Sequence, residues 1–361
     1  MKRILFISPS LGSGGSERQM TTMACLLKEL GYHVEFLCFL EENFYEFLLH
    51  KHNIKVNRIT ASNNLTLMFA ARKFIRRTKF DISISFLEGA NFINIFSSLG
   101  GKTWKVITGE RNSKESTFNG IKNKIFCFFQ RYADIIVCNS ENAKRMWINH
   151  FPYYEGKLKV IYNTITIQPI NSTYTPKRNG KINIVIAASY QYLKNPIGVI
   201  KSLNLLSQSQ RLKIHIDWYG NTASKGCSKV YSEGCELIEE YSLTDVITLN
   251  NASSSIQNKM NNADFVALLS KVEGLPNAIC EALTIGKPVI MSRMSDFAKL
   301  VDGSNGYLVD WDDYEGIKNV FIKASELNVN ELLAMGKHSK EISEKLFSKQ
   351  KTIDQWITLM N

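Results

Sequence analysis

The sequence alternates short apolar runs with longer amphipathic segments, and this alternation restricts the fold more than any other feature. In the first half, segments such as 17–30 and 66–78 have helical spacing, whereas the apolar runs are rich in β-branched and aromatic residues. We expect strands at 4–8, 33–40, 54–59, 81–86, 104–108 and 134–138. Parallel strands need long crossover connections, so the pattern predicts an α/β fold with a doubly wound parallel sheet of about six or seven strands.

The same pattern starts again after residue 180. Strands are expected at 182–187, 213–219, 246–249, 265–269 and 288–292, and helices at 196–207, 235–241, 277–285 and 314–327. The polar stretch 171–180 then forms a linker. Because 361 residues exceed a usual single-domain length, we predict two Rossmann-like domains, residues 1–170 and 181–347, that face each other across a cleft. The loops after both first strands should face that cleft.

The excess positive charge lies in the first half. Residues 1–180 contain 25 Lys/Arg and 13 Asp/Glu, whereas the remainder contains 19 and 20. A basic half favours an anionic partner, which could be nucleic acid, an acidic membrane surface or a phosphorylated substrate. Two stretches, 65–77 and 118–131, interleave cations with apolar side chains. They are either interfacial helices on an anionic leaflet or amphipathic helices packed on the sheet, and both interpretations stay open.

The cysteines and the amino terminus indicate the compartment. The seven cysteines are dispersed and form no C-x-x-C pair, which is typical of reduced core thiols in a cytosolic protein. The apolar run 4–7 stops at Ser8 and Pro9, so we interpret it as a strand and not as a signal peptide. No window approaches the roughly 18 apolar residues of a spanning helix. Membrane contact, if present, is expected to be peripheral.

The loop after the first predicted strand is rich in glycine. Gly12, Gly14 and Gly15 precede a helix, where bare backbone lets a phosphate approach the helix amides. The dinucleotide fingerprint is incomplete because Glu17 occupies the third glycine position, and the lysine of a P-loop is absent. A phosphate-binding loop and a tight turn without a ligand both fit this segment.

A second group of residues lies in the second half. Lys194 precedes Asn195 and Pro196, which suit the cap and first turn of a helix, so its cation should lie at a helix amino terminus where an anion would bind. Glu273 and Glu281 stand eight residues apart across a predicted loop-to-helix junction. A carboxylate can accept hydrogen bonds from two adjacent hydroxyls, so one glutamate suits a ribose and the other a hexose.

These elements together resemble family 4 of the retaining, nucleotide-sugar-dependent glycosyltransferases. The resemblance rests on the E-x7-E element from Glu273 to Glu281, Lys194 in Lys-Asn-Pro, Gly-Gly-Ser-Glu-Arg at 14–18, Val-Ile-Tyr-Asn at 160–163 and Asn-Gly-Tyr-Leu-Val at 305–309. It covers nearly the whole chain. It implies the GT-B fold, with helix 348–361 crossing back to the first domain, and a role in bacterial surface polysaccharide assembly, such as O-antigen, lipopolysaccharide or capsule.

The resemblance also implies roles for individual residues. Lys194 would bind the donor diphosphate and stabilise the leaving group, Glu273 would hold the transferred sugar, and Glu281 would hold the ribose. We thus predict Lys194 and Glu273 as catalytic residues. The other predicted donor-binding residues are Gly14, Gly15, Gly274, Leu275, Pro276 and Asn277. The family commonly has an arginine three or five residues before the lysine, whereas this chain has Gln191 and Ser189, which leaves one cation.

The implied reaction moves a hexose or N-acetylhexosamine from a nucleotide sugar, with a UDP-sugar favoured. The implied acceptor is a polyprenyl-diphosphate-linked glycan at the inner face of the cytoplasmic membrane, so the basic half would face the acceptor and an anionic membrane surface. Glu110, Arg111 and Asn112 follow a predicted strand and look like an acceptor-side element of related transferases.

Two other classes of protein fit parts of the sequence. A nucleic-acid-binding protein would use the basic half, but no RNP, zinc-finger or helix-turn-helix pattern accompanies it, and we expect no nucleic acid partner. An NAD-dependent oxidoreductase would need the complete fingerprint. Asp310-Trp311-Asp312 resembles a metal-binding D-x-D, but we interpret it as a turn. No cofactor and no metal are predicted; the nucleotide sugar is a co-substrate.

Overall fold

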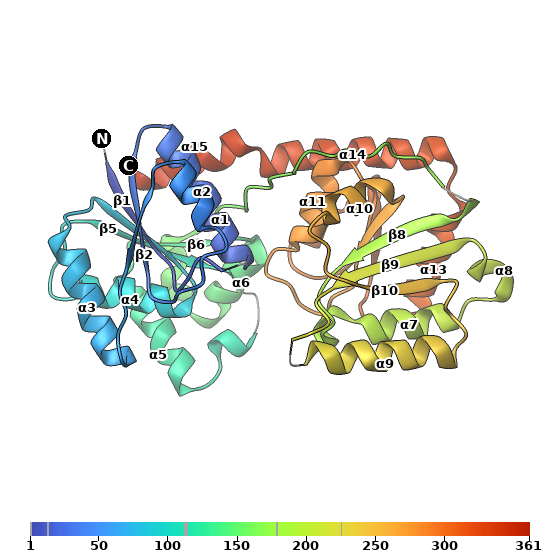
Figure 1. Ribbon diagram of the computed structural model, residues 1–361, viewed down its shortest axis with the longest axis horizontal. Helices are drawn as coiled ribbons and strands as arrows, with labels where there is room; N and C mark the ends of the chain where they lie inside the picture. Colours follow the sequence, from blue (N-terminus) through green and yellow to red (C-terminus); the bar gives the residue numbers. More distant parts are fainter. Residues whose placement is uncertain (1, 13, 112–114, 178–179, 225) are drawn as a thin grey trace. The chain divides into compact units, whose positions relative to one another are not determined.

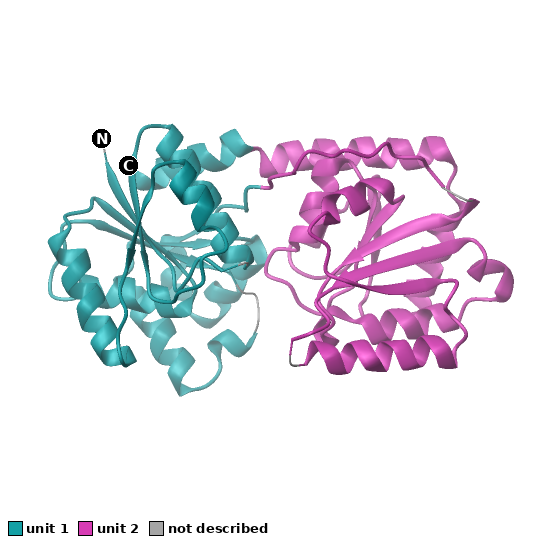
Figure 2. Cartoon of the chain, in the orientation of Figure 1, with its two compact units in different colours: residues 1–164, 349–361 teal, residues 165–348 magenta. Residues whose placement is uncertain are grey.

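The computed structural model describes residues 2–12, 14–111, 115–177, 180–224 and 226–361, and it contains two compact units. Unit 1 comprises Met1–Thr164 and Lys349–Asn361, and unit 2 comprises Ile165–Ser348 (Figure 2). Each unit is a parallel sheet covered by helices on both faces (Figure 1).

The sheet of unit 1 has seven parallel strands in the order β3-β2-β1-β4-β5-β6-β7. The strands are β1 (Arg3–Ile7), β2 (His33–Cys38), β3 (Lys55–Arg58), β4 (Ile82–Phe86), β5 (Lys105–Glu110), β6 (Ile135–Cys138) and β7 (Leu158–Val160). Strand β1 pairs with β2 and β4, so the chain changes direction across the sheet at β1. In open sheets, ligands bind at the carboxyl ends of the strands beside such a reversal.

The helices of unit 1 pack their apolar sides on this sheet. They are α1 (Gly15–Glu29), α2 (Glu46–Lys51), α3 (Asn64–Arg77), α4 (Glu88–Ser98), α5 (Ile121–Phe129), α6 (Glu141–His150) and α15 (Lys349–Met360), with 3₁₀ turns at Glu115–Phe118, Gln130–Tyr132 and Pro152–Lys157. The two faces of the sheet carry separate buried clusters, one reaching α1 and α15 and the other reaching α3 to α6. This division confirms a doubly wound sheet.

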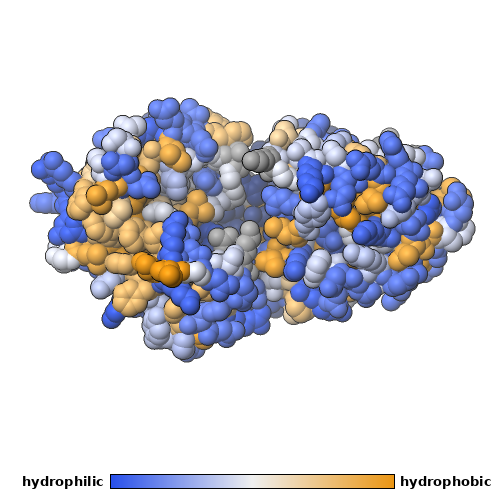
Figure 3. All heavy atoms as spheres, turned by 90° about the horizontal axis from the view of Figure 1, so that it is seen from below, coloured by the Kyte–Doolittle hydropathy of each residue, from blue (hydrophilic) through white to orange (hydrophobic). Residues whose placement is uncertain are grey.

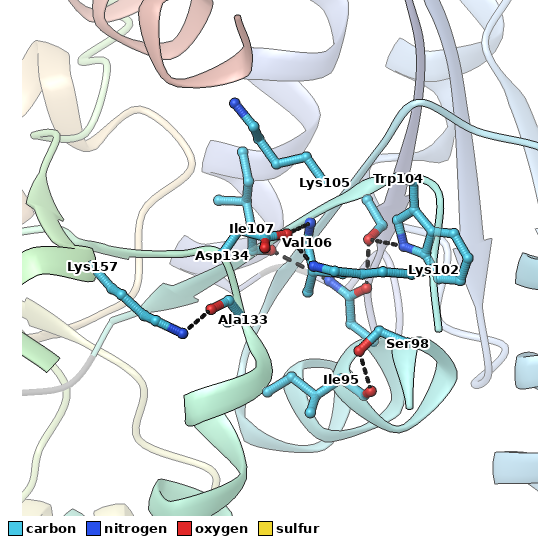
Figure 4. Close-up of polar contacts among 12 residues, drawn as sticks. Ile95, Ser98, Lys102, Trp104, Lys105, Val106, Ile107, Ala133, Asp134 and Lys157 are labelled. Carbon is cyan, nitrogen blue, oxygen red and sulfur yellow. Dashed lines mark hydrogen bonds and ion pairs between the residues drawn. The ribbon is translucent and has the colours of Figure 1, made fainter. Parts of the chain in front are cut away.

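Polar contacts hold the amino-terminal edge of β5 and β6 (Figure 4). The carboxylate of Asp134, directly before β6, accepts a hydrogen bond from the Val106 backbone N–H (2.7 Å) and forms an ion pair with the Lys102 ammonium. The Lys157 ammonium donates to the Ala133 carbonyl oxygen at 2.7 Å. These contacts fix the edge opposite the one where the strands end.

Unit 2 repeats the architecture with six parallel strands in the order β10-β9-β8-β11-β12-β13. The strands are β8 (Ile182–Ala187), β9 (Ile214–Gly220), β10 (Ile247–Asn251), β11 (Phe265–Leu268), β12 (Val289–Ser292) and β13 (Gly306–Val309). The helices are α7 (Pro196–Asn204), α8 (Gln208–Arg211), α9 (Cys227–Glu240), α10 (Ile256–Asn262), α11 (Asn277–Ile285), α12 (Phe297–Leu300), α13 (Tyr314–Glu326) and α14 (Val329–Phe347), with a 3₁₀ turn at Tyr192–Lys194.

The predicted linker differs from the structure. The first unit ends at Thr164 and not at residue 170, and residues 165–180 are counted with unit 2. The reason is hydrogen bonding: the Gln168 N–H donates to the Gln257 side chain (2.7 Å), and the Tyr174 hydroxyl donates to Asp264 (2.7 Å). Asp264 is fully buried and so anchors this segment. These hydrogen bonds attach the segment to unit 2.

The last helix, α15, completes unit 1. Its Ile353, Trp356 and Met360 belong to the buried cluster beneath α1. Two lysines of unit 1 donate to its final carbonyls, Lys105 to Leu359 (3.0 Å) and Lys2 to Met360 (2.7 Å). Cations are favourable at a helix carboxyl terminus. The prediction that the final helix returns to the first domain is confirmed.

Other predictions differ at the level of elements. Strands β7 and β13 and helix α14 were not predicted, α9 begins eight residues before the predicted start at 235, and α1 begins at Gly15 instead of Glu17. The seven cysteines are all free thiols; six are buried and Cys235 is half-buried. Residues Trp311 and Asp312 lie in a turn, as predicted. In the described part of the chain, no helix is long and apolar enough to cross a membrane.

Candidate active site

Lys194 lies in the loop that follows β8, the first strand of unit 2. It ends a 3₁₀ turn, and Asn195 directly after it adopts φ 68° and ψ 36°. Asn195 does not cap α7 with its side chain as we expected; its amide donates instead to the Trp311 carbonyl oxygen at 2.6 Å. The left-handed backbone at Asn195 turns the chain sharply into α7 and leaves Lys194 at the carboxyl edge of the sheet.

The side chain of Glu273 contacts that of Lys194, although the two residues are 79 positions apart in the sequence. Its Oε1 forms an ion pair with the Lys194 ammonium and accepts a hydrogen bond from the Ser270 hydroxyl (2.8 Å). The backbones of the two loops also join, because the Lys271 N–H donates to the Leu193 carbonyl oxygen at 2.8 Å. The side chains of Lys194 and Glu273 are 20% and 14% exposed, so the pair is partly screened from water but reachable.

Glu281 lies on α11, which begins at Asn277 as predicted, with Pro276 before it. Gly274, Leu275 and Pro276 form the loop between Glu273 and this helix. The Glu281 carboxylate is 5% exposed and accepts a hydrogen bond from the Gln257 amide (3.0 Å). The first amides of a helix have no acceptor within the helix and carry its positive dipole end, so this junction suits oxygen atoms of a ligand.

The sequence motifs did not indicate Lys271, which lies beside this site. Its side chain is exposed, and its ammonium lies 4.8 Å from the centre of the Trp311 ring. Asn195 binds the carbonyl oxygen of the same tryptophan. The signal that could have found Lys271 is its place two residues before Glu273, in the loop after β11. It supplies a second cation beside the Lys194 loop, where Ser189 and Gln191 replace the usual arginine.

The glycine loop of unit 1 is bordered by carboxylates. Gly14 directly precedes α1, and Gly15 is the first residue of the helix. A Cβ at Gly14 would overlap the carboxylate of Glu17, and a Cβ at Gly12 would overlap that of Glu42. Carboxylates repel a phosphate and accept hydrogen bonds from hydroxyls. This loop therefore suits a hydroxyl-bearing ligand better than a diphosphate.

Glu110 ends β5 and lines a cavity of about 60 Å³ in unit 1. Its carboxylate accepts hydrogen bonds from the Arg111 N–H (2.8 Å) and from the Trp147 indole N–H (3.2 Å). Asn112, the third member of the predicted acceptor element, lies outside the described residues.

Arg111 is held by residues of unit 1. Its guanidinium carbon lies 3.6 Å from the centre of the Phe86 ring, and its Nη1 donates to the Asn163 side chain at 3.0 Å. Burial lowers the pKa of this guanidinium to about 10. Its buried Nε has no hydrogen-bond partner among the described residues. Arg111 thus joins the end of β5 to the segment where the chain leaves unit 1.

The two doubly wound parallel sheets define the GT-B class of α/β proteins, and the family comparisons agree. The model described as Glycosyltransferase Family 4 matches residues 13–168, and the model described as Glycosyl transferases group 1 matches residues 169–342. The chain belongs to these glycosyltransferase families and is a glycosyltransferase enzyme.

Similar proteins come from several bacteria. Two are Campylobacter jejuni enzymes. The N-acetylgalactosamine-N,N'-diacetylbacillosaminyl-diphospho-undecaprenol 4-alpha-N-acetylgalactosaminyltransferase is 23% identical, with 89% of this chain and 90% of the relative covered. The GalNAc-alpha-(1->4)-GalNAc-alpha-(1->3)-diNAcBac-PP-undecaprenol alpha-1,4-N-acetyl-D-galactosaminyltransferase is 26% identical, with 87% and 86% covered. The Erwinia amylovora amylovoran biosynthesis glycosyltransferase AmsD is 21% identical, with 100% and 99% covered.

Solved structures show the same fold. The Anabaena protein HepE in complex with UDP superposes with a TM-score of 0.86 at 18% identity and covers 99% of both chains. A glycosyltransferase from Rickettsia africae superposes with a TM-score of 0.81 at 17% identity, with 99% of this chain and 98% of that chain covered. These likenesses establish the GT-B fold of this chain.

Proposed function

We propose that this enzyme moves a hexose or N-acetylhexosamine from a UDP-sugar to a polyprenyl-diphosphate-linked glycan, with retention of the anomeric configuration, in surface polysaccharide assembly. Structures of HepE hold UDP, UDP with glucose, or UDP-glucose. The two Campylobacter relatives are named for transfer to glycans on undecaprenyl diphosphate. These names support the donor class and the lipid-linked acceptor.

The observation that carries the proposal is the ion pair between Lys194 and Glu273 at the carboxyl edge of the sheet of unit 2. A diphosphate that engages the Lys194 ammonium would compete with Glu273 for this cation, which frees the carboxylate to accept hydrogen bonds from the transferred sugar. Glu281, almost fully buried, would accept hydrogen bonds from the ribose hydroxyls. One ion pair thereby couples phosphate binding to sugar binding.

In the proposed reaction, an acceptor hydroxyl oxygen bonds to the anomeric carbon while the bond from that carbon to the diphosphate oxygen breaks on the same face. The hydroxyl proton passes to the departing phosphate oxygen. Lys194 and the first amides of α11 stabilise the negative charge that develops on the diphosphate. Since these groups supply the positive charge, we propose that no metal ion is required.

The test is substitution of the two donor-site residues. We expect Lys194→Ala and Glu281→Ala each to lose about 1.5–3 kcal/mol of transition-state stabilisation, roughly a 10- to 100-fold fall in kcat/KM for UDP-sugars. The matched control is Lys213→Ala, an exposed lysine directly before β9. Near-normal turnover by both donor-site variants would contradict the proposal, and full dependence on added Mg²⁺ after chelation would contradict its metal-free chemistry.

We further propose that an apolar surface on α3 and α5 contacts an anionic membrane. Its exposed apolar residues are Leu65, Phe69, Ile121, Ile125 and Phe128, and its exposed cations are Lys73, Arg76, Arg77, Lys122, Lys124 and Arg131. The ring of Phe69 on α3 contacts that of Phe96, and Phe92 contacts both Phe96 and Phe126 of α5. These contacts connect the two helices through α4. Figure 3 shows hydrophobic side chains gathered on this side of unit 1. Such a surface suits the interfacial contact that a lipid-linked acceptor requires.

The membrane proposal is tested by sedimentation with vesicles. We expect binding to vesicles of phosphatidylglycerol and weaker binding to phosphatidylcholine, with high salt reducing the difference. Ile121→Ser combined with Phe128→Ser should reduce binding about tenfold, whereas Leu205→Ser, at an exposed leucine of unit 2, should not. Equal binding to both lipids would contradict the proposal.

A further inference from the structure

Gln257 of α10 bonds to two parts of unit 2 at once. Its Nε2 donates to the Glu281 carboxylate (3.0 Å) and to the Thr166 carbonyl oxygen (3.2 Å), and its Oε1 accepts from the Gln168 N–H (2.7 Å). We propose that Gln257 is a positioning residue of the donor site, which holds the Glu281 carboxylate for the ribose of the nucleotide and connects it to the segment that follows unit 1. This inference rests on the proposed function, because it takes Glu281 as the ribose-binding residue.

The partners of Gln257 fix the orientation of its amide. A carboxylate and a carbonyl oxygen accept hydrogen bonds, and a backbone N–H donates one. The two N–H groups of the amide therefore face Glu281 and Thr166, and its oxygen faces Gln168. A flipped amide would lose all three contacts, so these hydrogen bonds have one arrangement.

Burial makes this amide hard to replace by water. Gln257 is 7% exposed and Glu281 is 5% exposed, and α10 packs against α11 (Figure 1). A buried carboxylate that loses a donor is not rehydrated, and a hydrogen bond to a charged group contributes more than one between neutral groups. Gln257 therefore orients the Glu281 carboxylate before a nucleotide arrives, and less conformational freedom is lost when the ribose hydroxyls bind.

The same helix holds the connecting segment, residues 165–172, by hydrogen bonds. The side chains of α10 that bond to it are those of Gln257, Asn258 and Asn261. The Asn258 side chain accepts from the Asn171 N–H at 3.0 Å, and the Asn261 amide donates to the Ser172 carbonyl oxygen at 2.9 Å. In the part of the chain that the structure describes, the two asparagine side chains bond to this segment and not to Glu281. They are therefore matched controls for Gln257.

The contacts of Gln257 link ribose binding to the connecting segment, which begins directly after Thr164, the last residue of unit 1 before the crossing. Ribose hydroxyls that engage Glu281 would fix its carboxylate, and the carboxylate fixes the amide that accepts from the Gln168 N–H. Opening of the Gln168 hydrogen bond then requires more free energy, which slows exchange of this N–H with solvent. A ligand without ribose does not act through Glu281.

The first test is isothermal titration of the full chain with UDP and, separately, with inorganic pyrophosphate. Gln257→Met keeps the length of the side chain and removes its hydrogen bonds, so we expect a roughly tenfold rise in the Kd for UDP and less than about a twofold change for pyrophosphate. The controls Asn258→Ala and Asn261→Ala should leave both Kd values within about twofold. In a Glu281→Ala background, Gln257→Met should have little further effect on UDP binding, because the two residues act as one unit.

The second test is hydrogen exchange of the Gln168 N–H in the unmodified protein, and it applies even if Gln257→Met does not fold. Saturating UDP should slow this exchange by a factor of about five or more, and saturating pyrophosphate should not. In Gln257→Met, UDP should no longer slow the exchange. Equal exchange of the unmodified protein with and without UDP would overturn the link between Glu281 and the connecting segment.

The outcomes separate this inference from the proposed function. A Kd for UDP that rises in Glu281→Ala but not in Gln257→Met overturns the positioning role and leaves the donor assignment intact. Equal weakening of UDP and pyrophosphate binding by Gln257→Met also overturns it, because the loss is then structural and not specific to ribose. Normal UDP binding by Glu281→Ala overturns the assignment of Glu281 to the ribose, and failure of the unmodified protein to bind UDP overturns the proposed function itself.

Discussion

Two lysines of unit 2 differ in whether their surroundings favour the charged ammonium. Lys271 is exposed beside Trp311, next to the loop of Lys194. Lys287, two residues after the end of α11, is 3% exposed, and its ammonium lies 3.1 Å from the centre of the Tyr174 ring. The first can stay charged at little cost and attract a diphosphate. The second loses most of its hydration when folded.

Lys271→Met should weaken UDP binding because the Lys194 cation is shared with Glu273. An exposed cation of this kind contributes about 0.5–1 kcal/mol, a roughly two- to fivefold rise in Kd. Isothermal titration with UDP at low salt measures the effect. Lys271→Arg should bind nearly as the unmodified protein does, and Lys213→Met is the control. An unchanged Kd in Lys271→Met would exclude the role.

Lys287 should make stability depend on pH. Burial lowers its pKa to about 7, against the opposite effect of Asp264, so between about pH 7 and pH 10.5 the unfolded chain binds a proton that the folded chain does not. The free energy of unfolding therefore rises with pH between about pH 7 and pH 10.5, and it levels off below about pH 7, where both states hold the proton.

Lys287→Met removes this contribution and keeps the length of the side chain. We expect the variant to be more stable than the unmodified protein by on the order of 3 kcal/mol at pH 7, with the difference shrinking by pH 9. The contact with the Tyr174 ring offsets part of the gain. Thermal unfolding from pH 6 to 9 measures it; a constant difference across that range would refute the assignment.

At the scale of elements, α14 and α11 meet through glycines. Gly286 ends α11 with φ 88°, and a Cβ at Gly336 of α14 would overlap the Gly286 carbonyl oxygen. Backbone cannot move aside as a flexible side chain can. The close approach of these helices therefore requires a residue without a Cβ.

Gly336→Ala should separate the two helices and destabilise unit 2 by about 1–3 kcal/mol. Urea unfolding measures the change. The control is Gly89→Ala in α4, where an added Cβ meets nothing within 4 Å, and where alanine should raise stability by up to about 1 kcal/mol. Equal stability of Gly336→Ala and the unmodified protein would show that α14 shifts freely.

The helices and strands that could be predicted from the sequence are those whose buried face consists of apolar side chains. Strand β8 and helix α11 were predicted with their observed bounds because hydrophobic side chains mark them. Helix α14 was missed because half of its buried positions are small: Gly336, Ser339 and Ser343. Apolar periodicity cannot reveal a face that packs through glycine and serine. The three-residue edge strand β7 is too short to show a period.

The site was predictable as a set of residues but not as a geometry. Motif resemblance located Lys194, Glu273 and Glu281, yet neither spacing nor propensity indicates that the first two form an ion pair. For the cavity beside Glu110, the sequence indicated Glu110 and Arg111 but not Glu88 or Trp147. Its lining residues come from β5, α4, α5, α6 and two 3₁₀ turns, and only the tertiary fold brings them together.

At the scale of the whole molecule, the chain passes from unit 1 to unit 2 and then returns. Helix α15 therefore belongs to unit 1 although unit 2 separates it from the rest of that unit in the sequence. Trp356 carries much of this attachment: it is 3% exposed and lies 6.2 Å from the Phe86 ring, centre to centre. Phe86 in turn stacks on Arg111. The helix therefore supports Phe86 and, through this ring, Arg111.

Trp356→Ala should cost unit 1 about 3–5 kcal/mol through the cavity that it leaves. Calorimetry should show unit 1 unfolding at a lower temperature, while added UDP still raises the transition of unit 2. Leu212→Ala, at a leucine that is 63% exposed, is the control and should change stability by less than about 0.5 kcal/mol. An unchanged first transition in Trp356→Ala would show that α15 adds little to the core.

The discontinuity of unit 1 sets an order of folding during synthesis. Residues 165–348 leave the ribosome as one uninterrupted piece, so unit 2 can form its core before α15 has emerged from the ribosome. The first 164 residues emerge earlier, but their buried cluster lacks Ile353, Trp356 and Met360 until the second unit has been made. The half of the enzyme translated first is thus the half completed last, and its apolar surface must be kept from aggregating in the interval.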